Sequence, residues 1–276
     1  MTNKTIRTDF GSVAEVAALP KSGSTKKNQE LWESVSSPDR SGSGWTEWWG
    51  PNKEVVSDVL NYTDNGWVWG AEKIGKLADQ ISIPVLETVK RKLTRGPEGD
   101  YLDIHQVYRG NISNAWTKKR RTSTRGPKRF QLVTKLGANC GTSGEKLFWR
   151  GVACLALAKA IIEAGHAVEI IAYSTTKNCF ITGNQDHEMV TINVKPFNMA
   201  LDMESLATTT CLSGFYRYYL FLARLQHGLD VGQGFGRDGH DVPEIESGSA
   251  KQIVVPGEIQ SKLEVEEYLK NITEDL

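Results

Sequence analysis

The chain has 276 residues, 39% hydrophobic and 24% charged, a size that suits one large domain with a sizeable core or one domain plus an appendage. Its formal net charge is zero, so no global field attracts nucleic acid or an anionic membrane, and any electrostatic function must be local. No apolar run approaches the roughly 18 residues of a membrane span, and the start does not resemble a signal peptide. The four cysteines form no CxxC pair. We therefore expect a soluble cytoplasmic protein with reduced thiols.

The first 98 residues divide into a polar segment and a tryptophan-rich segment. Residues 1–30 are rich in Ser, Lys and Gly, with one amphipathic patch over 10–19, and we expect a flexible polar arm. Residues 31–98 are expected to form a Trp-rich, mostly helical N-terminal region, with helices over 51–60 and within 71–93. Its six tryptophans are Trp32, Trp45, Trp48, Trp49, Trp67 and Trp69.

These tryptophans allow two interpretations. Large aromatic side chains most often form a small core or clamp a segment onto the main domain, because each buries a large area. They also stack on unpaired bases, with roughly 1–3 kcal/mol per base. We favour the core for most of them and keep one or more of Trp45, Trp48 and Trp49 as base-stacking candidates.

A basic run follows, in a segment over 117–128 that reads as a connection without apolar periodicity. Phosphate backbones suit such a cluster through counterion release. The run lies between Trp116 and Phe130, and aromatic residues beside cations are what single strands use for stacking. A solvated connection without a ligand is the alternative interpretation. The candidate phosphate contacts are Lys118, Lys119, Arg120, Arg121, Arg125, Lys128 and Arg129, seven cations with no carboxylate among them, and Trp116 is the candidate stacking residue.

An α/β pattern occupies residues 99–276. A buried strand over 130–138 is followed by a small polar loop over 139–144, an apolar helix over 146–164 and a second strand over 168–173. This unit predicts a three-layer domain with a mainly parallel sheet. Ligands bind such sheets at loops that follow the carboxyl ends of strands, so the loop over 139–144 is a candidate site. The later elements are a strand over 187–194, a helix over 203–226, a glycine-rich loop over 228–239, a strand over 253–256 and a final helix capped by Ser261.

The helix over 146–164 carries Arg150-Gly151-Val152-Ala153-Cys154-Leu155, and the last strand and helix have the sequence IVVPGEIQSKLEVEEYLKNI. Together these segments resemble a von Willebrand factor A-like domain. In that family the loop after the first strand carries an Asp-x-Ser-x-Ser motif that holds a divalent cation. The corresponding positions here are Asn139, Gly141 and Ser143, of which only Ser143 matches.

The departure from that motif bears on metal binding. Mg²⁺ is usually held by at least one carboxylate, and this loop has lost its leading Asp. We therefore expect no cofactor. The alternative is a retained Mg²⁺ site in which Ser143 is assisted by a distant carboxylate, for which Asp202 is the candidate.

The layout of the whole chain is similar to that of small von Willebrand A-like proteins of tailed bacteriophages and mobile elements. One kind binds single-stranded DNA and brings a phage RNA polymerase to its template. The resemblance implies a single-stranded-DNA-binding accessory that recruits transcription or replication machinery. The composition described above adds the expectation of no membrane partner. The loop residues Asn139, Gly141, Thr142 and Ser143 would then face a protein partner such as a polymerase. The alternative is a protein–protein adaptor, for example for an AAA+ ATPase, with no nucleic-acid role.

Catalytic motifs are missing from the sequence. No Walker motif or dinucleotide fingerprint occurs, and Cys140 has no assigned base beside it. Strand alternation points His187 away from its acidic neighbours Asp186 and Glu188, which argues against a metal cluster there. We therefore expect a binding protein rather than an enzyme.

Overall fold

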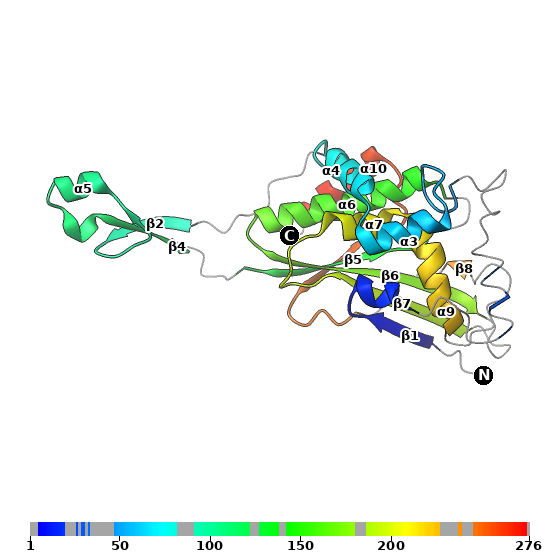
Figure 1. The fold of residues 1–276 in the computed structure, drawn as a ribbon. Helices are drawn as coiled ribbons and strands as arrows, with labels where there is room; N and C mark the ends of the chain where they lie inside the picture. Colours follow the sequence, from blue (N-terminus) through cyan, green and yellow to red (C-terminus); the bar gives the residue numbers. More distant parts are fainter. Residues whose placement is uncertain are drawn as a thin grey trace.

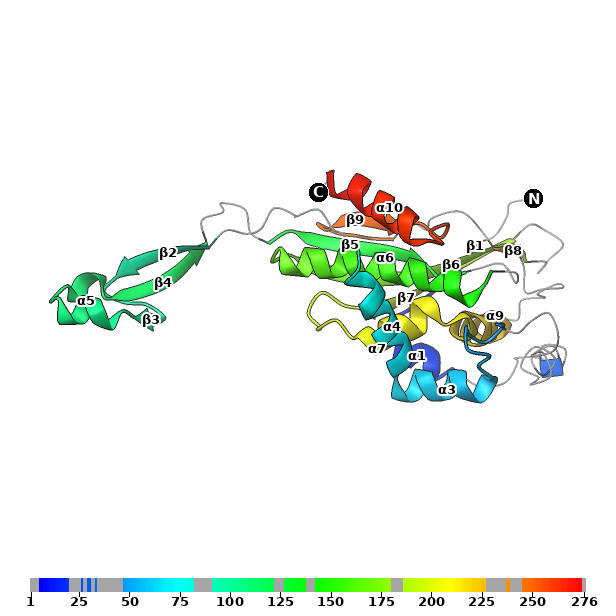
Figure 2. The ribbon, with the colours of Figure 1, turned by 90° about the horizontal axis from the view of Figure 1, so that it is seen from above.

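The computed structural model describes residues 5–19, 26, 29–30, 33, 47–81, 91–121, 127–137, 142–179, 186–226, 237–238 and 245–274. Figures 1 and 2 show a body built on one large sheet and a small unit that projects from one end of it. The two parts carry different sheets, one with six strands and one with three.

The large sheet confirms the predicted α/β class. Its central strands are β5 (Arg129–Lys135) and β6 (Ala167–Cys179), which run parallel as predicted. β7 (Asp186–Lys195) pairs antiparallel with β6, so the sheet is mixed and mostly parallel. β9 (Lys251–Val255) lies parallel to β5 on its other side. The order is β1-β7-β6-β5-β9, with β8 (Arg237–Asp238) pairing along β6.

The helix α6 (Gly144–Glu163) is buried along most of its length, as its apolar circumference predicts. The helices α4 (Val68–Ala78), α6, α7 (Met203–Cys211) and α10 (Lys262–Glu274) lie over one face of the sheet, whereas three layers were predicted (Figure 1). On α10, the backbone N–H of Glu264 donates to Ser261 Oγ at 3.4 Å, the predicted cap. None of the described helices combines the length and hydropathy needed to cross a bilayer.

The single helix predicted over 203–226 is interrupted. α7 ends before Leu212, whose backbone is extended (φ −83°, ψ 107°). The short helix α8 (Ser213–Phe215), a π-helical turn η3 (Tyr216–Leu220) and α9 (Phe221–Gln226) then follow. Periodicity alone did not reveal the break, because the apolar residues continue through it.

Residues 5–19 correct the prediction of a flexible arm over 1–30. The strand β1 (Thr5–Phe10) pairs in parallel with β7 at the edge of the large sheet. The helix α1 (Val13–Ala17) follows it. Ser12 Oγ accepts from the backbone N–H of Glu15 at 3.2 Å, and the Glu15 carboxylate accepts from the N–H of Gly11 at 2.7 Å. This reciprocal capping fixes the start of α1.

The tryptophan-rich region packs into the core of the body. Trp67 precedes α4 and stacks on Tyr62 of α3 (Val56–Asn65), with ring centroids 5.7 Å apart. Its ring also lies 5.5 Å from that of Phe148 on α6. Trp48 is only 6% exposed, and the Arg217 guanidinium lies 4.2 Å from its ring centroid. The prediction that Trp48 stacks on bases is therefore wrong.

The projecting unit comprises residues 91–121, so the domain boundary expected at residue 98 falls inside it. Its sheet has the order β2-β4-β3, formed by β2 (Arg91–Gly96), β3 (Tyr101–Leu102) and β4 (Trp116–Arg121). The short helices α5 (Ile104–Tyr108) and η2 (Ile112–Asn114) connect β3 to β4. The basic residues 118–121 thus belong to a strand rather than to the predicted connection. Leu93 likewise lies in β2 rather than in a helix.

Candidate nucleic-acid interface

The two long strands of the projecting unit align cationic positions with one another. The antiparallel register of β2 and β4 sets Arg91 opposite Arg121 and Lys92 opposite Arg120. Like charges directly opposite each other across an antiparallel pair are destabilising. The register therefore concentrates positive charge on the two paired strands. The cations of the two strands are Arg91, Lys92, Arg95, Lys118, Lys119, Arg120 and Arg121, and neither strand contains a carboxylate.

The charge of the projecting unit differs from that of the whole chain. Residues 91–121 contain eight Lys or Arg against three Asp or Glu, a net +5 in a chain of net charge zero. Within the unit, the Arg95 guanidinium pairs with the Asp103 carboxylate at 3.3 Å. Arg95 is not part of the predicted basic run, so this ion pair leaves the charge of the run intact. The positive electrostatic field is therefore confined to the projecting unit, because the chain as a whole has no net charge.

One face of the small sheet places an aromatic residue beside a cation. Trp116 and Lys118 are two residues apart on β4, so they share a face of the strand. Lys118 is exposed and Trp116 is half-buried. The β2 position opposite Trp116 is Gly96, where an added Cβ would meet its nearest atom only at 3.9 Å. The position opposite Trp116 thus carries no side chain.

A close turn holds β3 against β4. The N–H of Asp100 donates to the Thr117 carbonyl at 2.9 Å, and Thr117 Oγ1 donates to the Tyr101 carbonyl at 3.2 Å. A Cβ on Gly99 would lie 2.5 Å from the Thr117 carbonyl oxygen, closer than side chains tolerate. Glycine at position 99 is thus a requirement of this strand pairing.

Two of the predicted cations lie on the body, at the root of the projecting unit. Lys128 and Arg129 are exposed beside the start of β5. The Lys128 N–H donates to His166 Nδ1 at 3.2 Å. The Arg129 guanidinium carbon lies 4.1 Å from the ring centroid of Phe197. The predicted phosphate-binding residues therefore fall into two groups, while Arg125 and the candidate Trp45 lie outside the described residues.

The loop after β5 is described only in part. Thr142 and Ser143 are half-buried, whereas Asn139 and Gly141 lie outside the described residues. The Glu47 carboxylate accepts from the N–H of Gly144, the first residue of α6, at 2.6 Å. An acidic residue from the tryptophan-rich region thus caps this helix. Binding of a partner by the loop stays a prediction.

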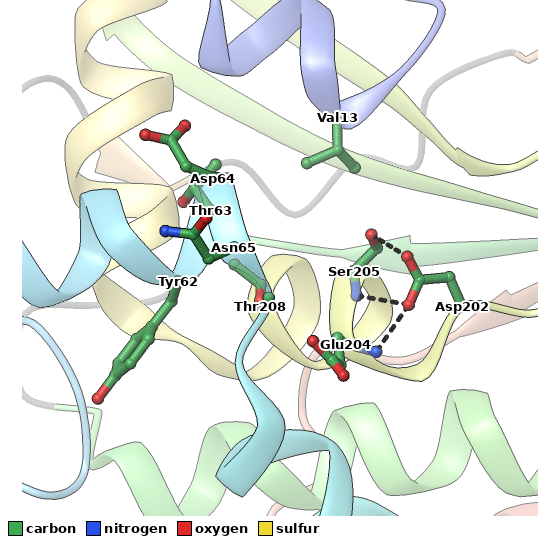
Figure 3. A pocket seen from close by; sticks show the side chains of 10 residues that line it. Val13, Tyr62, Thr63, Asp64, Asn65, Asp202, Glu204, Ser205 and Thr208 are labelled. Carbon is green, nitrogen blue, oxygen red and sulfur yellow. Dashed lines mark hydrogen bonds between the residues drawn. The ribbon is translucent and has the colours of Figure 1, made fainter.

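The positions of Ser143 and Asp202 contradict a shared metal site. Asp202 caps α7: its carboxylate accepts from the N–H groups of Glu204 at 3.0 Å and Ser205 at 3.2 Å (Figure 3). Ser143 lies at the other end of α7, beside Glu47, whose carbonyl accepts from Ser213 Oγ. The nine residues of α7 span about 13 Å. Asp202 therefore does not assist Ser143.

Two further observations bear on metal binding and thiol chemistry. Within the described ranges, no three His, Cys, Asp or Glu side chains are grouped to hold a metal ion. Burial raises the pKa of Cys154 to about 12 and that of Cys211 to about 11, so both thiols are protonated at neutral pH. Cys140, considered as a nucleophile, lies outside the described residues.

Sequence reasoning missed three members of the cationic surface, Arg91, Lys92 and Arg95. Arg91 and Lys92 were placed in a helical segment that ends at residue 93, and Arg95 was assigned to no element, whereas all three belong to β2. A signal was present, because the run Arg91-Lys92-Leu93-Thr94-Arg95 precedes a Pro-Glu-Gly-Asp turn, a combination typical of a hairpin strand.

The fold and this surface define the class of protein: an α/β body on a mixed, mostly parallel sheet, with a projecting cationic unit. A family model described as a domain of unknown function, DUF7192, matches residues 2–276, and the chain belongs to that family. No curated protein and no solved structure matches the chain.

Proposed function

We propose that this chain is a non-catalytic accessory protein of the cytoplasm that binds single-stranded nucleic acid and recruits transcription or replication machinery to it. The observation that carries the proposal is the cation-on-cation register of β2 and β4. That register opposes the stability of the unit unless an anion offsets it. A phosphate backbone is a repeating polyanion and fits two aligned rows of cations.

The roles within the interface follow from position. Lys118 and Arg120 share a strand face with Trp116, whereas Lys119 and Arg121 belong to the opposite face. The two pairs contact phosphates on the two sides of β4, joined by the β2 cations opposite. Trp116 stacks on a base, since it shares a strand face with Lys118 and the position opposite it is a glycine. Stacking requires unpaired bases, so a single strand is favoured over a duplex.

The finer fold assignment is part of this proposal. The sequence resemblance to a von Willebrand A-like domain is supported by the parallel unit β5–α6–β6 and by the terminal β9 and α10. The metal loop of that family would then serve here without a cation. The phage-type recruitment role rests on the same resemblance.

Salt-dependent binding tests the proposal. A fluorescent single-stranded oligonucleotide is titrated with the wild type and with Lys118→Ala/Lys119→Ala/Arg120→Ala/Arg121→Ala at several salt concentrations. Loss of four phosphate contacts lowers the slope of log K against log salt by about 3. The matched control replaces four lysines on the body, Lys76, Lys146, Lys262 and Lys270, with alanine. Equal binding by the wild type and the β4 variant would refute the proposal.

A second candidate function, a protein–protein adaptor, is favoured by the far end of the projecting unit. Ile104, Tyr108 and Ile112 recur every four residues and are exposed there, Tyr108 at 82%. Apolar patches of this kind mark interaction surfaces. In the adaptor function, the β4 variant leaves nucleic-acid affinity unchanged and partner binding depends on these three residues. The exposed apolar residues of the unit are Tyr101, Leu102, Ile104, Val107, Tyr108 and Ile112.

A further inference from the structure

A pocket of about 530 Å³ lies at the root of the projecting unit. It is bordered by the end of α6, the start of β6 and the segment 195–201. Figures 1 and 2 show this end of α6 on the side from which the unit projects. Its volume falls in the range of small-molecule sites. Its apolar lining comprises Ile162, Ala167, Val168, Phe197, Met199, Ala200 and Leu201.

The two lysines of the pocket are already engaged. Lys195 is buried, and its Nζ donates to the carbonyls of Val168 at 2.6 Å and Pro196 at 3.2 Å. Lys159 Nζ pairs with Asp79 at 2.8 Å. Its other polar lining residues are Glu163 and His166, and His166 Nδ1 already accepts from the Lys128 N–H. The pocket is therefore not an anion site, and its mostly apolar lining suits a flat or apolar group.

The cationic side chain of Arg129 lies beside this pocket. The guanidinium of Arg129 lies 4.1 Å from the centroid of Phe197, a lining residue. Arg129 is exposed, so the side of its guanidinium away from Phe197 is accessible. Unpaired bases stack on guanidinium planes as well as on aromatic rings. Lys128, the next cation, is also exposed and suits an adjacent phosphate.

We propose that this pocket receives one unpaired base of a single strand whose phosphates run along the projecting unit and past Lys128. The base stacks on the side of the Arg129 guanidinium away from Phe197, and the exposed pocket residues Met199 and Ile162 offer it apolar contact. The inference rests on the proposed function, because the same strand must first be held by the cations. It assigns Arg129 a stacking role in addition to the predicted phosphate contact.

The substitution Arg129→Lys separates the two roles. Lysine retains the charge but not the planar group, so a residue that only contacts phosphate tolerates the change. Loss of one base stack lowers the affinity for an oligothymidylate roughly fivefold to 150-fold. The salt slope stays that of the wild type because the charge is unchanged. Arg109→Lys, at an exposed position of the projecting unit, is the matched control and leaves the affinity unchanged.

A second variant and a second oligonucleotide distinguish a lost base contact from misfolding of the Arg129→Lys variant. Phe197→Leu keeps an apolar lining, yet it removes the ring beneath Arg129 and lowers the affinity in the same way. An oligothymidylate with abasic positions keeps every phosphate and binds wild type and Arg129→Lys equally. A single 5-iodouracil in the strand crosslinks on irradiation to peptides that contain residues 195–201.

The outcomes distinguish this inference from the proposed function. If the β4 alanine variant loses affinity while Arg129→Lys and Phe197→Leu bind as the wild type does, and no crosslink maps to the pocket, the pocket inference is wrong and the proposed function stands. If the wild type shows no salt-dependent retention of the oligonucleotide, both are wrong.

Discussion

Arg224 Nε lies 2.7 Å from Glu188 Oε2, and both side chains are only 1% exposed. This ion pair joins α9 to β7 inside the body, and the same guanidinium donates to Ser174 Oγ of β6 at 3.0 Å. A buried charge that loses its partner is strongly destabilising, whereas an apolar replacement of the whole pair is often neutral.

Arg224→Met is therefore expected to lower the free energy of unfolding by about 3–5 kcal/mol. The double variant Arg224→Met/Glu188→Leu is expected to recover most of that loss, because no uncompensated carboxylate is left. Urea denaturation of the single and double variants measures both values. A double variant less stable than Arg224→Met would contradict this account.

Glu47→Ala should weaken the capping of α6. The carboxylate accepts from the N–H of Gly144 and faces the positive end of a helix of 20 residues. We expect a loss of about 0.5–2 kcal/mol in unfolding free energy. Glu145→Ala, an exposed acidic residue in the first turn of the same helix, is the control and should cost less. If both variants lose the same unfolding free energy, Glu47 does not cap α6 specifically.

Trp116 and Trp48 should respond oppositely in oligonucleotide titrations. Trp116→Ala removes a stacking platform and should lower single-strand affinity by about 1–3 kcal/mol. Trp48→Phe, at a buried position against Arg217, should leave affinity unchanged even where it lowers thermal stability. A loss of affinity for Trp48→Phe with unchanged stability would speak against this division of roles.

Gly99→Ala should loosen the projecting unit alone. The added Cβ would lie 2.5 Å from the Thr117 carbonyl oxygen, so β3 and β4 cannot keep their present approach. Hydrogen exchange should quicken at the amides of β4, while those of α6 retain their protection. Ala at Gly110, where nothing lies within 4 Å of an added Cβ, tests the strain of a positive φ without a clash.

The buried thiols predict a dependence of stability on pH. Burial raises the pKa of Cys154 to about 12 and that of Cys211 to about 11, above the value near 8.5 expected in the unfolded chain. Because the folded-state pKa is raised, the stabilisation is complete below pH 8 and declines as the pH rises beyond about 8.5. Cys154→Ala/Cys211→Ala should flatten this decline in urea titrations between pH 7 and 10. An unchanged slope would exclude the thiols as its cause.

Local patterns predicted the elements of the body because their information lies in neighbouring residues. The apolar circumference of α6 and the continuous apolar run of β6 identify a buried helix and a buried strand without knowledge of their partners. The capping of α10 by Ser261 is equally local. The basic run was visible for the same reason, as seven cations without a carboxylate.

The sequence by itself thus determined the α/β class, the main helix and strands of the body and the cluster of positive charge. Only the tertiary structure decided that Thr5–Phe10 joins the sheet as β1, that Trp48 is buried and that Arg91 and Lys92 lie opposite Arg121 and Arg120. These features depend on pairing between segments distant in sequence. Strand register and burial arise from the partner as much as from the segment itself, so no window along the chain contains them.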